Sequence, residues 1–175
     1  MLKESLSKVL SEQVNAEYYS AYLYLSMSTY AHRAGFKGFA NWLFVQAQEE
    51  LAHAVHIYQY ILDRSSAISF AGIAVPPTTF EGLKSVFEKV LAHEQHVTDM
   101  INNIATVAQR DNDHASYNFI MWFVNEQVEE EASAEEILTK IKLIGDNNAL
   151  LYALDTELAA RVYVDPFAAG ANAGA

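Results

Sequence analysis

Hydrophobic residues recur every three or four positions through four long stretches of the chain, a spacing that predicts four long amphipathic helices. Glycines, prolines and short polar clusters mark where these stretches end. A capping-box spacing predicts the start of the third helix, and a polar turn containing Asp113 predicts the N-cap of the fourth. The predicted helices run from about Leu2 to Ala34, Gly38 to Arg64, Thr78–Thr79 to Gln109, from the Asp111-Asn112-Asp113 turn to Ile144 and, for a short fifth one, Asn147 to Ala160.

The links between these helices predict their arrangement. Short links join the first helix to the second and the third to the fourth, so each pair should be antiparallel. The middle link, residues 65–79, contains Gly72 and Pro76-Pro77, has no helical pattern and is long enough to cross the bundle lengthwise. We therefore predict an all-α four-helix bundle with one long crossover plus a short C-terminal fifth helix. One domain should cover residues 1–164, and we expect the Ala- and Gly-rich residues 165–175 to form a mobile tail.

Composition narrows the classes of function. Only 3 prolines and 7 glycines in 175 residues agree with long helices, and a net charge of −11 argues against nucleic acid or an anionic membrane as a partner. The absence of cysteine excludes disulfides and thiol chemistry. Residues 1–5 lack the charged-then-apolar pattern of a signal peptide, and no apolar run reaches membrane-spanning length. We therefore expect a cytoplasmic protein.

Polar residues interrupt the inward-facing apolar stripe of every long helix. On the third helix a single carboxylate, Glu94, stands among residues such as Val90 and Val97. The interruptions lie near the middle of their helices, so they should share one layer of the bundle core. By helix they are Glu17 on the first, Glu50 and His53 on the second, Glu94 on the third, and Gln127 and Glu130 on the fourth; Gln46 is a further polar member of the second helix's stripe.

Several carboxylates in one core layer require a compensating charge. Burial costs each of them several kcal/mol, and like charges raise one another's pKa. No basic residue falls on the four stripes near this layer, so a metal ion is the direct solution. Carboxylate oxygens with one imidazole suit iron or manganese. Glu50 and His53 are three residues apart on one helical face and can bind a common ion.

Simpler interpretations remain for individual residues. A Glu-x-x-His spacing occurs by chance on many exposed helices, and Glu94 alone could be a satisfied core acid. Tyr24 lies seven residues after Glu17 and could hydrogen-bond a ligand or donate an electron; we favour a structural role. Five histidines fall off the layer, and we expect them at the surface: His32, His56, His93, His96 and His114.

Motifs around the layer resemble the non-haem ferritins of bacteria and archaea, and the resemblance covers nearly the whole chain. It is carried by Asn15-Ala16-Glu17-Tyr18-Tyr19, Gln48-Glu49-Glu50, His53, His93-Glu94-Gln95 and Glu126-Gln127-Val128-Glu129-Glu130-Glu131. It implies a ferritin-like fold and an iron-storage function. Subunits of that family form a hollow homo-oligomeric cage of twenty-four, and their ferroxidase centre oxidises Fe(II) with dioxygen or peroxide.

The resemblance also implies roles for single residues. Glu17, Glu50 and His53 would hold one iron, while Glu50, Glu94 and Glu130 would hold a second, with Glu50 bridging. Gln127 would shape the second position. A third, looser iron site would use Glu49, Glu126, Glu129 and Glu130; the alternative for the first three of these is an acidic surface patch.

Departures from neighbouring families exclude some chemistry and leave two rival functions. Bacterioferritins carry a second Glu-x-x-His where this chain has Gln127-Val128-Glu129-Glu130, and a haem-binding methionine where it has Leu51, so we expect no haem. One rival function is a di-iron oxygenase, which would need a substrate pocket reaching the metals. The other is a structural helical assembly whose polar layer sets the register of its helices.

Overall fold

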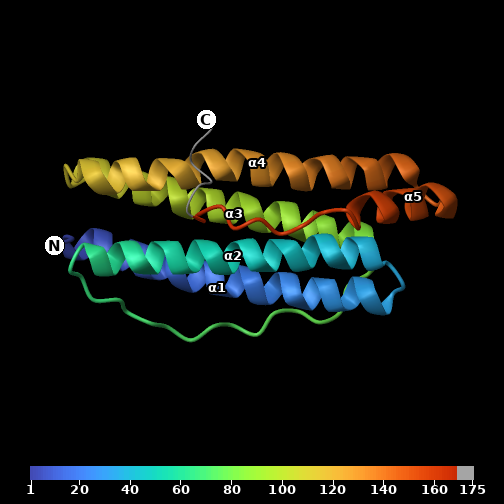
Figure 1. The fold of residues 1–175 in the computed structure, drawn as a ribbon, viewed down its shortest axis with the longest axis horizontal. Coiled ribbons are helices and arrows are strands. Elements are labelled where there is room, and N and C mark those ends of the chain that lie inside the picture. The colour runs from blue at the N-terminus through green and yellow to red at the C-terminus, as the bar shows by residue number, and fades with distance from the viewer. Residues whose placement is uncertain (169–175) are drawn as a thin grey trace.

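The computed structural model describes residues 1–168 of the chain, and these residues form helices but no strand. Two antiparallel helical pairs lie side by side, one made by α1 and α2 and the other by α3 and α4 (Figure 1). The prediction of an all-α four-helix bundle with a short fifth helix is confirmed. The helices are α1 (Glu4–Arg33), α2 (Lys37–Asp63), α3 (Leu83–Arg110), α4 (His114–Ile144) and α5 (Asn148–Leu158).

The link between α2 and α3 crosses the bundle lengthwise beside α1 (Figure 1). Three side chains of α1, taken in chain order, bond to three successive points of this crossover: Ser7 to Ser66 (2.9 Å), Asn15 to the Ala71 carbonyl (3.2 Å) and Ser26 to the Pro77 carbonyl (2.6 Å). The crossover therefore runs in the same direction as α1. It brings α3 to the end of the bundle where α1 finishes, so α2 and α3 run in the same direction.

The start of α3 differs from the sequence prediction. The capping box predicted at Thr78 is wrong, because α3 begins at Leu83 and its N-cap, Gly82, makes no side-chain cap hydrogen bond. Gly82 has φ of 142°, a backbone conformation that residues other than glycine rarely adopt. The turn from crossover to helix therefore occurs at this glycine. The other predicted cap is confirmed, since the Asp113 side chain accepts a hydrogen bond from the Ser116 backbone N–H at 3.0 Å.

The hydrophobic core consists of two clusters separated by the polar layer. One cluster includes Tyr24, Phe39 and Phe87, and the other includes Leu10 and Ile101. The predicted inward stripes are buried throughout, except at Tyr60 and Ile144, which are half-buried. Each fully buried aliphatic or aromatic side chain contributes about 1.5–3 kcal/mol. The two clusters therefore hold the helices firmly on both sides of the layer.

Helix α5 docks on the start of α2 through a buried carboxylate. The Asp155 side chain accepts hydrogen bonds from the backbone N–H groups of Gly38 (2.8 Å) and Phe39 (2.9 Å). These donors at a helix start have no partner inside their own helix. A Cβ at Gly38 would lie 1.5 Å from the Asp155 carbonyl oxygen, so only glycine allows the two helices to come this close.

Hydropathy along the described helices sets a limit on their environment: none combines the length and apolar character needed to cross a membrane. Of the predicted tail, residues 169–175 lie outside the described part of the chain, and residues 165–168 are described below. The proposed domain boundary at residue 164 stays a prediction.

Candidate metal centre

The five predicted ligands are buried in the middle of the bundle, and all four long helices contribute to them. Glu17 comes from α1, Glu94 from α3 and Glu130 from α4, whereas Glu50 and His53 share one face of α2. Within residues 1–168, Glu17, Glu50 and His53 form the one group of metal-binding side chains whose ligand atoms all lie within 4.8 Å of one another. His53 Nδ1 lies 3.6 Å from Glu50 Oε2.

Glu94 and Glu130 lie outside this tight group but are electrostatically linked to it. Burial and the charge of Glu94 raise the pKa of Glu130 to about 8. Burial, followed by the charge of Glu94, also raises the pKa of Glu50 well above its ordinary value, and Glu130 adds to this effect. The pKa of Glu17 is raised by burial and by the charge of Glu50. These four carboxyl groups therefore share one site that resists full deprotonation until a cation enters.

Glutamine amide groups donate hydrogen bonds to two of these carboxylates. Gln46 Nε2 donates to Glu130 Oε2 at 2.7 Å, and Gln13 Nε2 donates to Glu17 Oε1 at 2.8 Å. Gln13 was missed in the sequence, although it precedes Glu17 by four residues and so shares its helix face. Gln46 was recognised only as a polar member of the α2 stripe. Both glutamines are fully buried.

Gln127 and Tyr24 hold Glu94. Gln127 Nε2 lies 3.3 Å from Glu94 Oε2 and 3.2 Å from the Glu94 carbonyl oxygen, so it contacts one of the predicted ligands. The Tyr24 hydroxyl donates to Glu94 Oε1. Burial raises the pKa of Tyr24 well above its ordinary value, with a further contribution from the charge of Glu94. Tyr24 is therefore a neutral donor to a ligand.

Two buried ligand atoms lack any hydrogen-bond partner among the described residues. They are His53 Nε2 and Glu17 Oε2. An unpaired buried polar atom costs about 1–3 kcal/mol. A cation bound by the Glu17, Glu50 and His53 side chains would satisfy Glu17 Oε2, and this donor set suits iron. The residues present therefore fit a metal ion by their own chemistry.

The additional acidic residues lie beside this centre but do not form a second tight group within residues 1–168. Glu49 and Glu126 are half-buried, and Glu129 is exposed. Burial raises the pKa of Glu126, and the charge of Glu129 raises it further. Glu49 forms an ion pair with Arg161, whose Nη2 lies 2.6 Å from Glu49 Oε2. Arg161 follows α5 and lies on no periodic stripe, so nothing in the sequence indicated this pair.

Comparison with known proteins identifies the family to which this chain belongs. The family model described as "Ferritin-like domain" matches residues 7–144. The chain belongs to the ferritin family. Among ferritins, the bacterial non-heme ferritin of Staphylococcus haemolyticus is 40% identical over 163 residues, covering 93% of this chain and 98% of that protein. The bacterial non-heme ferritin of Staphylococcus aureus strain USA300 is 37% identical over the same length.

Solved ferritin structures agree with the fold over nearly the whole chain. The open pore ferritin of the hyperthermophilic archaeon Archaeoglobus fulgidus superposes with a TM-score of 0.91 at 42% identity, covering 93% of this chain and all of that one. An engineered closed form of the same archaeal ferritin gives a TM-score of 0.92 at 43% identity over 94% of this chain. The resemblance to non-haem ferritins of bacteria and archaea is confirmed.

Two histidines of this ferritin differ from their predicted surface position. His93 is half-buried, and its Nε2 lies 2.8 Å from Ser20 Oγ; burial and the charge of His96 lower its pKa to about 4. His56 is also half-buried, and its ring stacks on that of Phe119. Both residues were expected at the surface because they fall off the layer, but aromatic side chains of neighbouring helices, Tyr19 for His93 and Phe119 for His56, cover them. His32, His96 and His114 are exposed as expected.

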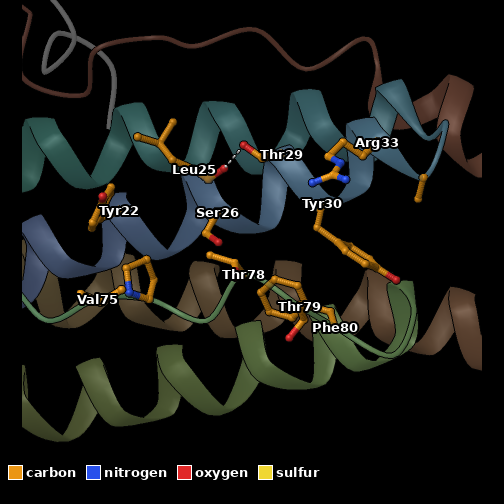
Figure 2. Close-up of a pocket in the computed structure, with 12 residues that line it drawn as sticks. Tyr22, Leu25, Ser26, Thr29, Tyr30, Arg33, Val75, Thr78, Thr79 and Phe80 are labelled. Carbon is orange, nitrogen blue, oxygen red and sulfur yellow. Dashed lines mark hydrogen bonds between the residues drawn. The ribbon is translucent and has the colours of Figure 1, made fainter.

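A cavity of about 730 Å³ lies between α1 and the crossover (Figure 2). Its wall includes Tyr22, Tyr30, Arg33 and Phe80, whose side chains are drawn in the close-up. Within residues 1–168, none of the predicted site residues lines it. An oxygenase would need a substrate pocket that reaches the carboxylates, and this cavity does not reach them.

Proposed function

We propose that this ferritin-family chain oxidises Fe(II) at a di-iron ferroxidase centre within each subunit and stores the Fe(III) as a mineral inside a hollow oligomer. Family membership supports the iron-storage role. The observation that carries the oxidation step is the buried group of Glu17, Glu50 and His53, whose ligand atoms lie within 4.8 Å of one another and in which Glu17 Oε2 has no hydrogen-bond partner among the described residues. Iron is the substrate of this centre and also the cargo of the oligomer.

The ligands divide into two overlapping sets in this proposal. Glu17, Glu50 and His53 hold the first iron, in keeping with their mutual distances below 4.8 Å. Glu50, Glu94 and Glu130 hold the second, in keeping with the strong mutual effects on their pKa values. Glu50 belongs to both sets and bridges the two ions.

The protein residues supply charge and geometry, and the iron ions supply the electrons. Each Fe(II) gives up one electron, so a pair of ions reduces one dioxygen to hydrogen peroxide, or one peroxide to water, with uptake of protons. Entry of the ions displaces protons from carboxyl groups whose pKa values are raised. The resulting carboxylates favour the higher positive charge of Fe(III). Gln127 and Tyr24 keep Glu94 oriented while the charge changes.

Oxidised iron then leaves the centre for the mineral. We assign Glu49, Glu126 and Glu129, together with Glu130, to a third and looser iron site beside the centre. The half-buried to exposed positions of Glu49, Glu126 and Glu129 suit transient binding better than permanent retention. The mineral requires an enclosed space, and we propose a cytoplasmic homo-oligomeric cage of twenty-four subunits without haem.

Stopped-flow oxidation of Fe(II) tests the centre. Aerobic addition of Fe(II) to the iron-free protein should give a fast phase that saturates near two ions per chain. Glu94→Ala should abolish the fast phase, whereas the control Glu88→Ala, at an exposed position of the same helix, should retain it. A rate that never saturates and equals that of buffer alone would exclude the ferroxidase function.

A further inference from the structure

The segment after α5, residues 159–168, turns back and runs along the bundle toward its middle (Figure 1). We call this segment the C-terminal strap. Asn41 anchors its beginning, because Asn41 Nδ2 donates to the Arg161 carbonyl oxygen at 2.9 Å. Phe167 anchors its end, because its ring stacks on His56 with centroids 3.7 Å apart and planes 9° apart. The strap is therefore fixed to α2 at both ends.

The strap's aromatic end reaches both helices that flank the metal centre. The Phe167 ring centroid lies 4.6 Å from that of Trp122 on α4 and 6.0 Å from that of the ligand His53 on α2. This aromatic contact lies beside the centre, on the part of the surface formed by α2 and α4. Glu49 and Glu126 belong to these two helices.

Between its anchors, the strap brings one cation to the acidic residues of this surface. The Arg161 guanidinium donates through Nη2 to Glu49 Oε2 at 2.6 Å and lies over the Trp42 ring, 4.7 Å from its centroid. Both side chains of the ion pair are largely covered, with 26% of Arg161 and 18% of Glu49 exposed. A charge-assisted hydrogen bond in such a partly dehydrated position is stronger than one at an open surface.

We propose that Arg161 is a built-in competitor for iron at Glu49, so that the C-terminal strap controls when the third site can fill. The guanidinium already binds Glu49 Oε2, so an iron ion that approaches this carboxylate meets a positive charge at hydrogen-bonding distance and binds fully only when Arg161 moves away. The two cations cannot share Glu49 without repelling each other at short range. The ferroxidase pair therefore fills first, and the third site fills only when the strap releases Glu49. This inference rests on the proposed third site and names its regulation.

Anaerobic titration of the full-length, iron-free protein with Fe(II) tests the proposal by isothermal calorimetry. Arg161→Gln should tighten the third binding step about three- to tenfold, because the competing charge is gone. Arg161→Lys keeps a cation and should stay close to the wild type. The double variant Arg161→Gln/Glu49→Gln should lose the gain, because the contested ligand is absent.

A second variant separates the strap from its charge. Phe167→Ala weakens the far anchor but leaves Arg161 in place, so it should tighten the third step by a smaller factor than Arg161→Gln. Equal third-step affinity in the wild type and Arg161→Gln, or a gain that persists without Glu49, would refute the competition. Loss of the third step in every variant refutes it as well. The pair-binding steps, which the same titration measures, report separately on the ferroxidase centre.

Discussion

Buried amide groups, rather than cations, orient the carboxylates of the metal centre. Gln13 holds Glu17, Gln46 holds Glu130, and each uses its amide nitrogen while its own carbonyl oxygen lacks a partner among the described residues. A neutral donor fixes a carboxylate oxygen without compensating its charge. The negative charge thus remains available for iron.

Replacement of Gln46 should expose this role. Gln46→Leu keeps the volume roughly constant but removes the hydrogen bond to Glu130, so the initial rate of Fe(II) oxidation should fall about tenfold or more, as for other groups that orient metal ligands. The matched control is Gln59→Leu, at an exposed position of the same helix. Stopped-flow absorbance measures both, and equal rates would mean that Glu130 needs no orienting donor.

The raised pKa values predict how pH affects the iron-free protein. Glu130 has a pKa of about 8 when folded, against about 4.3 when unfolded. The folded form thus binds the Glu130 proton more tightly than the unfolded form does. This proton stabilises the folded state fully below pH 4, and the stabilisation is lost as pH rises through 8. Between pH 5 and 8 the free energy of unfolding should fall by up to about 1.4 kcal/mol per pH unit for this group. Urea denaturation measures the slope.

A variant and a ligand control make this pH prediction specific. Glu130→Gln cannot lose a proton, so its slope should be flatter than that of the wild type. Saturating Zn(II) should also flatten the slope, because the metal keeps the carboxyl groups deprotonated at both ends of the range. A wild-type slope that already equals that of Glu130→Gln would contradict the raised pKa.

At the scale of helices, periodicity was sufficient for the bundle and for the polar layer. Glu17 and Glu94 could be placed in one layer because a helix repeats its inward face regularly, and the midpoints of long paired helices coincide. Periodicity could not predict the start of α3, because the helix begins after a turn set by the backbone angle of Gly82 and not by the spacing of apolar residues. It could not find the Arg161–Glu49 pair either, because that contact joins residues 112 positions apart across an irregular segment.

The docking of α5 makes a prediction about one glycine of α2. In Gly38→Ala the new Cβ would overlap the Asp155 carbonyl, so α5 should shift, and the free energy of unfolding should fall by about 1–3 kcal/mol. Gly72→Ala in the crossover is the control, since its Cβ would meet no atom within 4 Å. Thermal denaturation followed by circular dichroism compares the two. Equal melting temperatures would show that the contact between α2 and α5 can accept a Cβ at residue 38 without loss of stability.

At the scale of the whole molecule, apolar side chains remain exposed where self-association could cover them. Leu150 and Tyr152 on α5 are 52% and 73% exposed. Burying such residues between subunits explains how a chain with 51% apolar residues tolerates them. The sequence alone could predict assembly only by resemblance, because one chain contains no partner.

Charge at these positions should weaken assembly. Tyr152→Glu should shift the protein from the proposed cage, a particle of several hundred kilodaltons, toward smaller species, because an interface does not tolerate an unpaired buried charge. Asn103→Glu adds the same charge at an exposed position of α3 and should leave the particle intact. Size-exclusion chromatography with light scattering measures the mass. An unchanged mass for Tyr152→Glu would place α5 outside the interface.

The crossover divides the ligands between two halves of the chain, and this has a consequence during synthesis. The hairpin of α1 and α2 carries Glu17, Glu50 and His53, whereas Glu94 and Glu130 come later, on α3 and α4. In the proposed ligand assignment, the first hairpin of a nascent chain carries the ligands of one ferrous ion but not those of a pair. The proposed paired oxidation, in which two ferrous ions together reduce one oxygen molecule, therefore has to wait until the second hairpin docks.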